Sequence, residues 1–287
     1  MQPTVVITGA TSGFGYHTAI KCAEKGMKVI ATIRNEKKLK VFQQAGLEKS
    51  VEEKIEVWRL DVTKEASIED FKNSVAKLER VDVLINNAGF AIGGFLEQVP
   101  IKDYRRQFET NVFGIIQLIQ AVVPKMRKQK FGKIINVSSV SGLIGFPGLS
   151  AYVSSKHALE GLSESLRFEL KPFGIDVALI EPGSFETNIW SSGMDLPTAV
   201  YDPKSPYEEY VKGIWKALNR EDREDPRKVA DLMTKLALSE SLKKLRYPIG
   251  PGVRLNVFLK NTLPWRLLEK VVLSNLLGTH KKGSEEK

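Results

Sequence analysis

The segment Thr4–Lys25, T-V-V-I-T-G-A-T-S-G-F-G-Y-H-T-A-I-K-C-A-E-K, combines a strand, a glycine-rich turn and a helix. Thr4–Thr8 is β-branched and apolar, which is typical of a strand buried on both faces. Tyr16–Lys25 then predicts a helix that ends at Gly26. Glycines allow a tight turn, and the N-terminus of a helix offers free N–H groups to a phosphate. The segment therefore predicts a phosphate-binding turn, although its pattern, T-G-x-x-x-G-x-G, is not the common G-x-G-x-x-G.

The alternation of apolar strands and helices continues to about residue 238 without a linker, an internal repeat or a low-complexity tract. Further strands are expected at 28–33, 55–60, 81–85, 134–137 and 176–180. Further helices are expected at 35–44, 67–78, 102–128, 152–170 and 225–238. This order predicts an α/β fold of the Rossmann type, a doubly wound parallel sheet with helices on both faces, in a single domain. Ligands of such sheets bind at the carboxyl ends of the strands.

Composition excludes several classes of protein. Hydrophobic content of 42% and charged content of 27% are those of an ordinary soluble globular protein. The single cysteine, Cys22, rules out an internal disulfide, and with three scattered histidines no metal site is expected. There is no secretory signal and no apolar run of the ~18 residues that a membrane span needs, so we expect a cytoplasmic protein.

The net charge of +9 is concentrated near the C-terminus. From Glu240 onward there are ten Lys/Arg and four Asp/Glu, so +6 of the +9 belongs to this part. The rest of the chain is close to balanced, which argues against a nucleic-acid-binding face spread across the protein.

A second stretch, Asn136–Leu170, carries residues suited to proton chemistry. Tyr152 and Lys156 are four residues apart in a predicted helix, so their side chains share one face. A cation close to a phenol favours its ionised form. Ser139 lies thirteen positions before Tyr152 (152 − 139 = 13), at the end of a predicted strand, and offers a second hydroxyl.

Together these motifs resemble the short-chain dehydrogenase/reductase family, in family order and spacing from about residue 4 to 240. The A-T-I-R-N loop and the R-Y-P-I-G segment near residue 246 are similar to the hydroxysteroid/retinol dehydrogenase-like branch. The matching residues are T-G-A-T-S-G-F-G at 8–15, Asp61-Val62, N-N-A-G at 86–89, Asn111 in E-T-N-V-F-G, Ser139, Y-V-S-S-K at 152–156 and P-G-S-F-E-T at 182–187.

The resemblance implies a role for each matching residue. Tyr152 would exchange a proton with the alcohol or carbonyl oxygen, and Lys156 would lower the pKa of Tyr152 and hold the nicotinamide ribose. Ser139 would stabilise charge on the substrate oxygen, and Asn111 would hold a water on the proton path to Lys156. The expected cofactor contacts, besides Tyr152 and Lys156, are Gly9, Ser12, Gly13, Phe14, Gly15, Asp61, Val62, Asn87, Ala88, Gly89, Pro182, Gly183 and Thr187.

The end of the second strand favours NADP(H) over NAD(H). NAD-preferring enzymes of this fold place an acidic residue there to bind the ribose hydroxyls. This chain has Ile33 followed by Arg34, whose guanidinium can pair with the 2′-phosphate of NADP. We place Arg34 and Asn35 in the cofactor site. Glu36 is the residue that argues for NAD(H) instead, because its spacing from Gly15 fits the acidic residue of the NAD pattern.

The sequence after Pro182-Gly183 is apolar and aromatic, at the place where the family has a substrate lid, which we expect at about 184–215. We expect a hydride-transferring oxidoreductase acting on a carbonyl or secondary alcohol of a bulky lipophilic substrate, such as a steroid-, retinoid- or lipid-like ketone or aldehyde. The alternative is a nucleotide-binding regulatory protein that has kept the fold without turnover. The residues that suggest an apolar pocket are Leu143, Phe146, Phe185, Ile189, Trp190, Met194, Leu196 and Tyr201.

Residues 1–250 are thus expected to form the dinucleotide-binding and catalytic domain, with 251–287 as a basic amphipathic C-terminal extension. From Pro264 a helix is predicted in which eight of fourteen positions are apolar, too short to span a bilayer and too apolar to stand in water. We favour packing over the substrate pocket or against a second subunit. Peripheral contact with an anionic membrane is the alternative. The family resemblance also implies a homo-oligomer.

Overall fold

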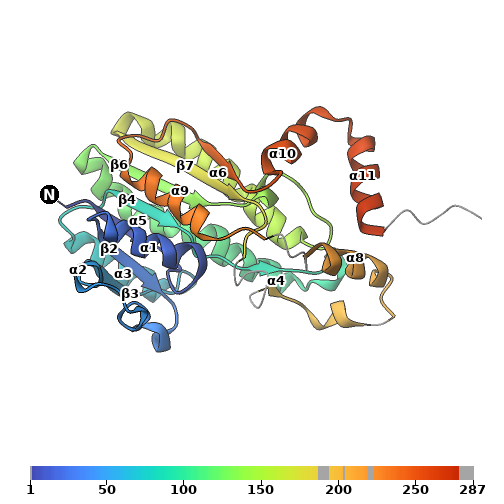
Figure 1. Ribbon diagram of the computed structural model, residues 1–287, viewed down its shortest axis with the longest axis horizontal. Coiled ribbons are helices and arrows are strands. Elements are labelled where there is room, and N and C mark those ends of the chain that lie inside the picture. Colours follow the sequence, from blue (N-terminus) through green and yellow to red (C-terminus); the bar gives the residue numbers. More distant parts are fainter. Residues whose placement is uncertain (1, 187–193, 203, 219–222, 278–287) are drawn as a thin grey trace, which may run out of the picture.

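A seven-stranded parallel sheet forms the centre of the computed structural model, which describes residues 2–186, 194–202, 204–218 and 223–277 (Figure 1). The strand order is β3-β2-β1-β4-β6-β7-β9, and the order reverses between β1 and β4, as in doubly wound sheets. The predicted fold class is confirmed. The strands are β1 (Thr4–Ile7), β2 (Lys28–Ile33), β3 (Ile55–Arg59), β4 (Val83–Asn86), β6 (Gly132–Val137), β7 (Ile175–Pro182) and β9 (Arg246–Ile249).

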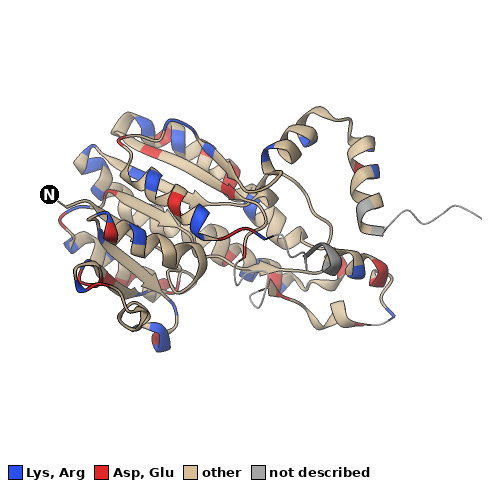
Figure 2. Ribbon diagram, viewed as in Figure 1, with Lys and Arg blue, Asp and Glu red and all other residues tan. Residues whose placement is uncertain are grey.

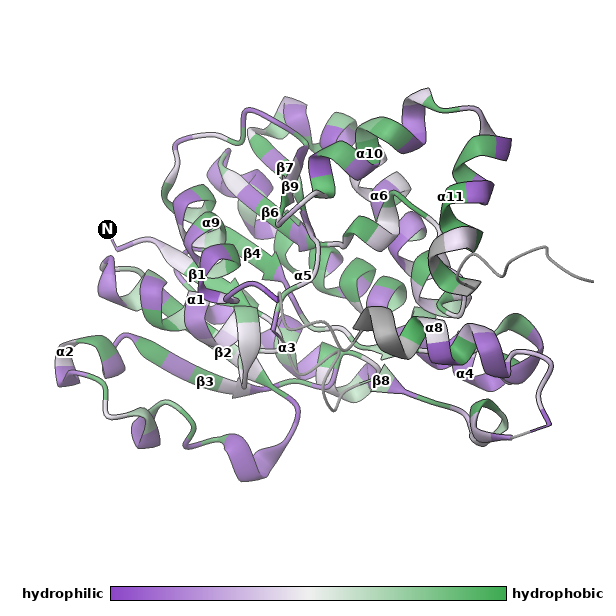
Figure 3. Ribbon diagram, turned by 45° about the vertical axis from the view of Figure 1, so that its right-hand side comes forward, coloured by the Kyte–Doolittle hydropathy of each residue, from purple (hydrophilic) through white to green (hydrophobic). Residues whose placement is uncertain are grey.

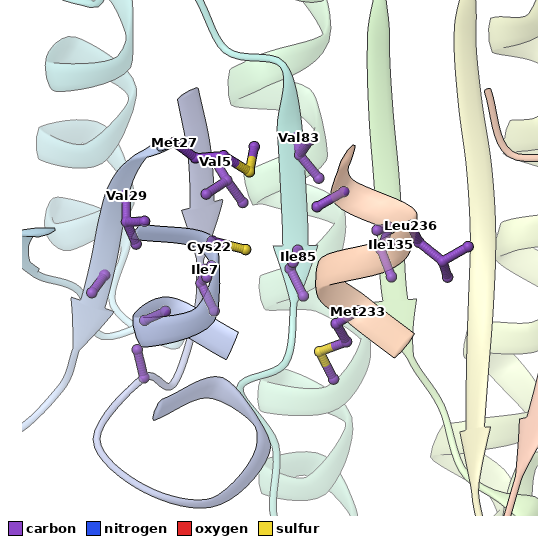
Figure 4. Close-up of a cluster of buried hydrophobic side chains, with 14 of the residues drawn as sticks. Val5, Ile7, Cys22, Met27, Val29, Val83, Ile85, Ile135, Met233 and Leu236 are labelled. Carbon is purple, nitrogen blue, oxygen red and sulfur yellow. The ribbon is translucent and has the colours of Figure 1, made fainter. Parts of the chain in front are cut away.

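Helices cover both faces of the sheet because alternate residues of each strand point to opposite sides. Val5 and Ile7 of β1 pack with α1 and α9 on one face, around Cys22 and Met233 (Figure 4). Val6 packs on the other face with α3, α5 and α6. One layer consists of α1 (Gly13–Glu24) and α9 (Arg227–Leu238). The other layer consists of α3 (Glu65–Lys77), α5 (Gly114–Gln129) and α6 (Ser150–Leu170).

Two predicted helices have a different form. Residues 35–44 were expected to form one helix, but the structure has two 3₁₀ turns, η1 (Glu36–Lys38) and η2 (Gln43–Ala45), followed by the short α2 (Lys49–Glu52). Residues 34–40 are all exposed and Phe42 alone in this segment is buried, so no apolar stripe exists to stabilise a helix. The expected helix at 102–128 is present as α4 (Ile101–Phe108), a π-helical turn (Glu109–Phe113) and α5.

The edge strand β9 was not predicted, because Pro248 interrupts its pattern. Proline is tolerated on an edge strand, where one side of the backbone needs no partner. β9 pairs with β7 in the register Ile180↔Tyr247 and Glu181↔Pro248. The remaining short elements of the main body are η3 (Leu96–Gln98), η5 (Val140–Gly142) and η6 (Lys171–Phe173).

The segment predicted to be a substrate lid, which keeps the name lid below, and a C-terminal arm lie beside the main body (Figure 1). The lid contains β8 (Met194–Asp195), which pairs with β5 (Ala91–Ile92), a 3₁₀ turn η7 (Thr198–Tyr201) and α8 (Glu208–Leu218). The arm consists of α10 (Val253–Thr262) and α11 (Trp265–Leu277), and α11 packs against α8. Among the described residues, none of the helices has both the length and the apolar character needed to cross a bilayer.

Candidate active site

Three of the four predicted catalytic residues meet at the carboxyl edge of the sheet. Ser139, Tyr152 and Lys156 line one small cavity beyond the ends of β4 and β6. Tyr152 and Lys156 lie one turn apart in α6, with only 4% and 5% of their surfaces exposed. The Lys156 Nζ lies 5.7 Å from the Tyr152 ring centroid and donates a 2.7 Å hydrogen bond to the Val137 carbonyl. The hydroxyls of Ser139 and Tyr152 share a hydrogen bond.

Asn111 is fully buried in the π-helical turn between α4 and α5. Its Nδ2 donates to the carbonyl oxygen of Phe90 at 3.1 Å and to the Ser155 hydroxyl at 3.2 Å. Its Oδ1 accepts a bond from the Phe90 N–H at 3.3 Å. These contacts link the π turn both to the segment after β4 and to α6. Turns of π-helix inside α-helices are common at functional sites, and the role of Asn111 stays a prediction.

Burial controls the charge of the Tyr152–Lys156 pair. It raises the pKa of Tyr152 to about 12, and the hydrogen bond with Ser139 offsets part of that rise. It lowers the pKa of Lys156 to about 8, opposed by the negative charge of Glu160. We expected Lys156 to lower the pKa of Tyr152, but here desolvation dominates, and the lysine amine is engaged with Val137. At neutral pH the phenol is therefore protonated.

The glycine-rich turn after β1 has the shape of a phosphate cradle. Gly9 has a φ of +65°, and a Cβ at this position would lie 2.9 Å from the Ala88 Cα. A Cβ at Gly15 would lie 2.5 Å from the Asn87 Nδ2. Ser12 precedes α1 without a side-chain cap, and the first turn of α1 has no acidic residue. The helix therefore presents free N–H groups and its positive dipole end, which fits the pyrophosphate of a dinucleotide.

Thr8 holds this turn against the segment after β4, a role that sequence analysis missed. Its Oγ1 accepts hydrogen bonds from the backbone N–H groups of Asn87 and Ala88, both at 2.9 Å. In return, the Asn87 Nδ2 donates to the carbonyl oxygens of Thr8 at 2.9 Å and Gly9 at 3.1 Å. The sequence did contain a feature that could have indicated this role, since Thr8 is the first residue of the T-G-x-x-x-G-x-G pattern.

The cavity at the catalytic residues is narrow, at about 50 Å³. The rings of Phe14 and Phe185 meet there edge to face, with centroids 5.7 Å apart. A Cβ at Gly89 would lie 3.3 Å from the Asn111 Oδ1 and 3.8 Å from the Lys156 Nζ, so glycine keeps the space above these two groups open. Other predicted cofactor residues also line the cavity, namely Asn87, Pro182 and Gly183. Thr187 lies outside the described residues.

The predicted adenosine-binding residues follow β2 and β3. Arg34 is exposed and makes no ion pair with the described residues. Asn35 caps η1, its Oδ1 accepting a 3.0 Å bond from the Lys37 N–H. Glu36 is paired with Arg59 of the neighbouring strand at 2.5 Å. The competing carboxylate is therefore partly neutralised.

Asp61 and Val62 lie at the end of β3, as predicted. The Asp61 Oδ1 accepts hydrogen bonds from the Thr63 N–H at 3.0 Å and the Thr63 hydroxyl at 2.7 Å. Val62 is buried against Gly114 of α5, where a Cβ would lie 2.7 Å from the Val62 carbonyl oxygen. Both residues are thus fixed at the carboxyl edge.

A cluster of charged side chains, one helical turn beyond Lys156 in α6, was not predicted. The Arg246 Nε of β9 donates to the Glu160 Oε2 at 2.8 Å, and its Nη2 donates to the Glu164 Oε1 at 2.6 Å. Glu181 of β7 is completely buried, and its Oε1 lies 3.8 Å from the Arg246 Nε. Burial, together with the charge of Glu160, raises the pKa of Glu181 to about 8. The sequence signal was the R-Y-P-I-G segment, whose arginine ties β9 to α6.

Glu181→Gln is expected to flatten the dependence of stability on pH. Because the pKa of Glu181 rises from 4.5 to about 8 on folding, the folded state binds more protons than the unfolded state between these values. The unfolding free energy of the wild type therefore falls as pH rises through this window, and glutamine removes this contribution. Urea unfolding from about pH 5 to about pH 8 measures the difference.

The matched control is Glu164→Gln, which removes a half-exposed carboxylate from the same arginine. It should keep the wild-type pH dependence. The assignment is contradicted if Glu181→Gln and the wild type lose stability equally over this range.

A doubly wound sheet with a phosphate cradle and a buried Tyr–Lys pair at its carboxyl edge defines a dinucleotide-dependent oxidoreductase. Comparison with known proteins agrees, since the family model described as short chain dehydrogenase matches residues 3–195. The uncharacterized oxidoreductase YusZ of Bacillus subtilis is 48% identical over 273 residues, covering 94% of this chain and 97% of that protein. The chain belongs to the short-chain dehydrogenase family.

Two further relatives have more specific names. A 3-ketodihydrosphingosine reductase of Bacteroides thetaiotaomicron is 35% identical over 258 residues, covering 88% of this chain and 90% of that protein. The 17-beta-hydroxysteroid dehydrogenase type 1 of Mus musculus is 34% identical over 257 residues, covering 86% of this chain and 74% of that protein. The second relative agrees with the predicted branch of the family.

Solved structures share the fold over most of their length. A short-chain dehydrogenase from Streptomyces avermitilis has a TM-score of 0.76 and 32% identity, covering 94% of this chain and 98% of that one. ElxO with NADP bound has a TM-score of 0.72 and 28% identity, covering 89% and 100%. A Burkholderia phymatum short-chain dehydrogenase/reductase in complex with NAD has a TM-score of 0.74 and 26% identity, covering 91% and 93%. Structural relatives therefore bind NADP or NAD.

Proposed function

We propose that this protein is an NADPH-dependent reductase of bulky lipophilic ketones or aldehydes, able to oxidise the corresponding alcohols in reverse. The observation that carries this proposal is the buried hydroxyl pair of Ser139 and Tyr152, with Lys156 one turn further along α6. Reduction of a carbonyl needs a protonated acid beside the oxygen. Tyr152 meets this need at neutral pH, because its pKa is raised to about 12.

Each catalytic residue has a separate task in this proposal. Tyr152 donates a proton to the substrate oxygen, and the Ser139 hydroxyl donates a hydrogen bond to the same oxygen as charge develops. Lys156 holds the nicotinamide ribose and supplies positive charge beside the phenol. Asn111, fixed by Phe90 and Ser155, orients the proton path toward Lys156. NADPH, when bound, supplies the hydride.

The dinucleotide would lie along the carboxyl edge of the sheet. The turn of Gly9, Ser12, Gly13, Phe14 and Gly15 would bind the pyrophosphate through backbone N–H groups. Arg34 and Asn35 would face the adenosine ribose. The base would contact Asp61 and Val62, and the nicotinamide half would contact Asn87, Ala88, Gly89, Pro182, Gly183 and Thr187.

The lid supports an apolar substrate. A Cβ at Gly93 would lie 2.8 Å from the Leu196 Cδ2, and one at Gly148 would lie 2.7 Å from the Ile214 Cδ1, so lid side chains rest directly on glycine backbone. Gly148 belongs to the loop between Ser139 and α6. The two relatives named for a ketosphingoid and a hydroxysteroid substrate add support. Five apolar side chains of the lid line a second small cavity beside Gly93 and Gly148, namely Met194, Leu196, Val200, Val211 and Ile214.

A panel of ketones and aldehydes, assayed with NADPH and NADH separately by cofactor absorbance, tests the proposal. We expect the highest kcat/KM for long-chain or polycyclic ketones with NADPH. A preference for small polar carbonyls would contradict the lipophilic substrate class. Failure of every carbonyl, with intact cofactor binding, would favour a binding protein without turnover.

Ile214→Ala is expected to raise the KM for a bulky ketone roughly tenfold while leaving the turnover of a small ketone unchanged, since a few buried methyl groups contribute about 1–3 kcal/mol of discrimination. Parallel kinetics with one large and one small ketone measure the effect. Leu238→Ala, at an exposed leucine of α9, is the matched control. Equal losses on both substrates would mean that Ile214 acts on the fold rather than on the substrate.

A further inference from the structure

The C-terminal arm exposes an unusual amount of apolar surface. Leu255, Phe258 and Trp265 are 59%, 62% and 65% exposed. Isolated exposed apolar side chains are normal, but contiguous ones mark contact sites. The described part of the chain has fifteen exposed large apolar side chains, and six of them lie within the 25 residues 253–277. Besides Leu255, Phe258 and Trp265, these are Leu267, Val271 and Leu273.

Only part of α11 is covered by the protein itself. Leu268, Val272 and Leu276 are half-buried, and their spacing of four places them on one side of the helix. At this side α11 meets α8, where a Cβ at Gly213 would lie 2.0 Å from the Leu276 carbonyl oxygen. Packing against the lid therefore explains why one side of α11 is apolar. Leu267 and Val271 lie on another side of the helix, where 46% and 45% of their surfaces stay exposed.

The same arm is positively charged (Figure 2). Residues 253–277 contain four cations and one anion, Glu269, giving a net charge of +3 (4 − 1 = 3). None of the four cations forms a salt bridge with any residue that the structure describes, so their charge is available to a partner. The cations are Arg254, Lys260, Arg266 and Lys270.

We propose that α10 and α11 form a docking surface for an anionic lipid bilayer, with the exposed apolar side chains entering the interface and the cations pairing with lipid phosphates. Apolar burial combined with basic charge is the pattern of interfacial helices. A second copy of the chain fits less well, because a twofold interface would bring two faces of charge +3 together. Figure 3 shows hydrophobic and hydrophilic residues intermingled along both helices, which project from the body.

The location of this surface connects it to the lid. α11 rests on α8, and Ile214 of α8 rests on Gly148 beside the catalytic loop. A bilayer bound to the arm would therefore lie next to the lid. Binding to lipid does not depend on the proposed function, but it would bring a lipophilic substrate to the enzyme.

Flotation of the full-length protein with vesicles tests the proposal. We expect flotation at low salt with equal parts phosphatidylcholine and phosphatidylglycerol, weaker flotation with phosphatidylcholine alone, and loss of the anionic preference at high salt. Phe258→Ser/Trp265→Ser should abolish flotation. Phe168→Ser, at a phenylalanine of α6 that is 80% exposed, is the matched control and should float like the wild type.

A second pair of variants separates charge from apolar contact. Arg266→Gln/Lys270→Gln should weaken partitioning onto anionic vesicles more than tenfold, since each basic side chain near such a surface contributes about a factor of five. Lys77→Gln/Lys128→Gln, at exposed lysines of the main body, should leave partitioning unchanged. Circular dichroism checks that each variant is folded.

A spectroscopic measurement covers the case in which the serine variant does not fold. Brominated lipids should quench tryptophan fluorescence in the wild type, and Trp265→Phe should remove that quenching. The proposal is overturned if the wild type fails to float with anionic vesicles at low salt. It is also overturned if sedimentation shows a dimer that Trp265→Ser converts to a monomer without changing vesicle binding, because the arm is then a subunit interface.

Discussion

Replacing Tyr152 with phenylalanine is expected to lower kcat by about 10²–10⁴, the range of general acid–base catalysis, while NADPH binding persists. The substitution removes one hydroxyl and keeps the ring, which is buried among Ser139, Lys156 and the cavity wall. Ser139 keeps its bond from the Ser141 N–H at 3.1 Å, so the loop should stay in place. Steady-state kinetics on a good ketone, together with NADPH fluorescence titration, measure both effects.

Tyr247→Phe is the matched control, because it also removes one phenol hydroxyl. That hydroxyl, on the edge strand β9, accepts a 3.1 Å bond from the Lys244 N–H, and Tyr247 is not among the residues that line the catalytic cavity. Its kcat should stay near the wild-type value. Near-normal turnover in Tyr152→Phe would sink the assignment of Tyr152 as the acid, and equal losses in both variants would point to stability instead.

Most of the fold could be predicted because its strands are buried on both faces. All residues of β1, β4, β6 and β7 are buried, so these strands carry apolar runs such as residues 5–7, 83–85 and 177–180, which are interrupted by only a few polar residues. β9 escaped prediction since it is an edge strand with intermediate burial and a proline. The two 3₁₀ turns after β2 were not predicted because the local composition favours a helix, whereas in the structure Phe42 is the one buried residue of the segment and only its neighbour Val41 packs partly beside it.

The catalytic residues could be located because their spacing in one helix fixes their geometry. Tyr152 and Lys156 share a face of α6 whatever the rest of the chain does. Their pKa values could not be predicted, because desolvation depends on which segments cover them. The π turn around Asn111 was equally hidden, since its residues also fit an ordinary helix.

The charge cluster was hidden for a topological reason. Glu160, Glu181 and Arg246 come from α6, β7 and β9, and they meet only because β9 pairs beside β7. Each residue alone resembles a solvated surface charge in the sequence. Long-range pairing of this kind leaves no periodic pattern.

Cofactor choice depends on how the structure distributes charge after β2 and β3. Arg34 is exposed and, within the described part of the chain, without an ion pair. Glu36, which could bind the ribose hydroxyls of NAD, is held by Arg59 at 2.5 Å. The pairing follows from the sheet register, in which Ile33 lies opposite Arg59. We infer that Arg59 neutralises the competing carboxylate and leaves Arg34 to face a 2′-phosphate.

Arg34→Ala is therefore expected to lower kcat/KM for NADPH by about 10- to 150-fold, the equivalent of a charge-assisted hydrogen bond of about 1.5–3 kcal/mol. The value for NADH should change little, because NADH has no 2′-phosphate. Lys38→Ala, at a neighbouring exposed cation of η1, is the matched control and should lower NADPH activity only slightly. Kinetics with both cofactors at constant ionic strength measure the ratio, since exposed charges are screened by salt.

The substitution Arg59→Ala distinguishes the role of Arg59 from that of Arg34. It leaves Arg34 in place but releases the Glu36 carboxylate, which would repel the 2′-phosphate, so NADPH activity should fall while NADH activity holds or rises. Glu36→Gln added to Arg59→Ala should restore NADPH activity, because the repelling charge is then absent. Stability should change little in either variant, as the pair is more than half exposed. A wild type that prefers NADH, or a double variant as poor with NADPH as Arg59→Ala alone, would refute this account of the site.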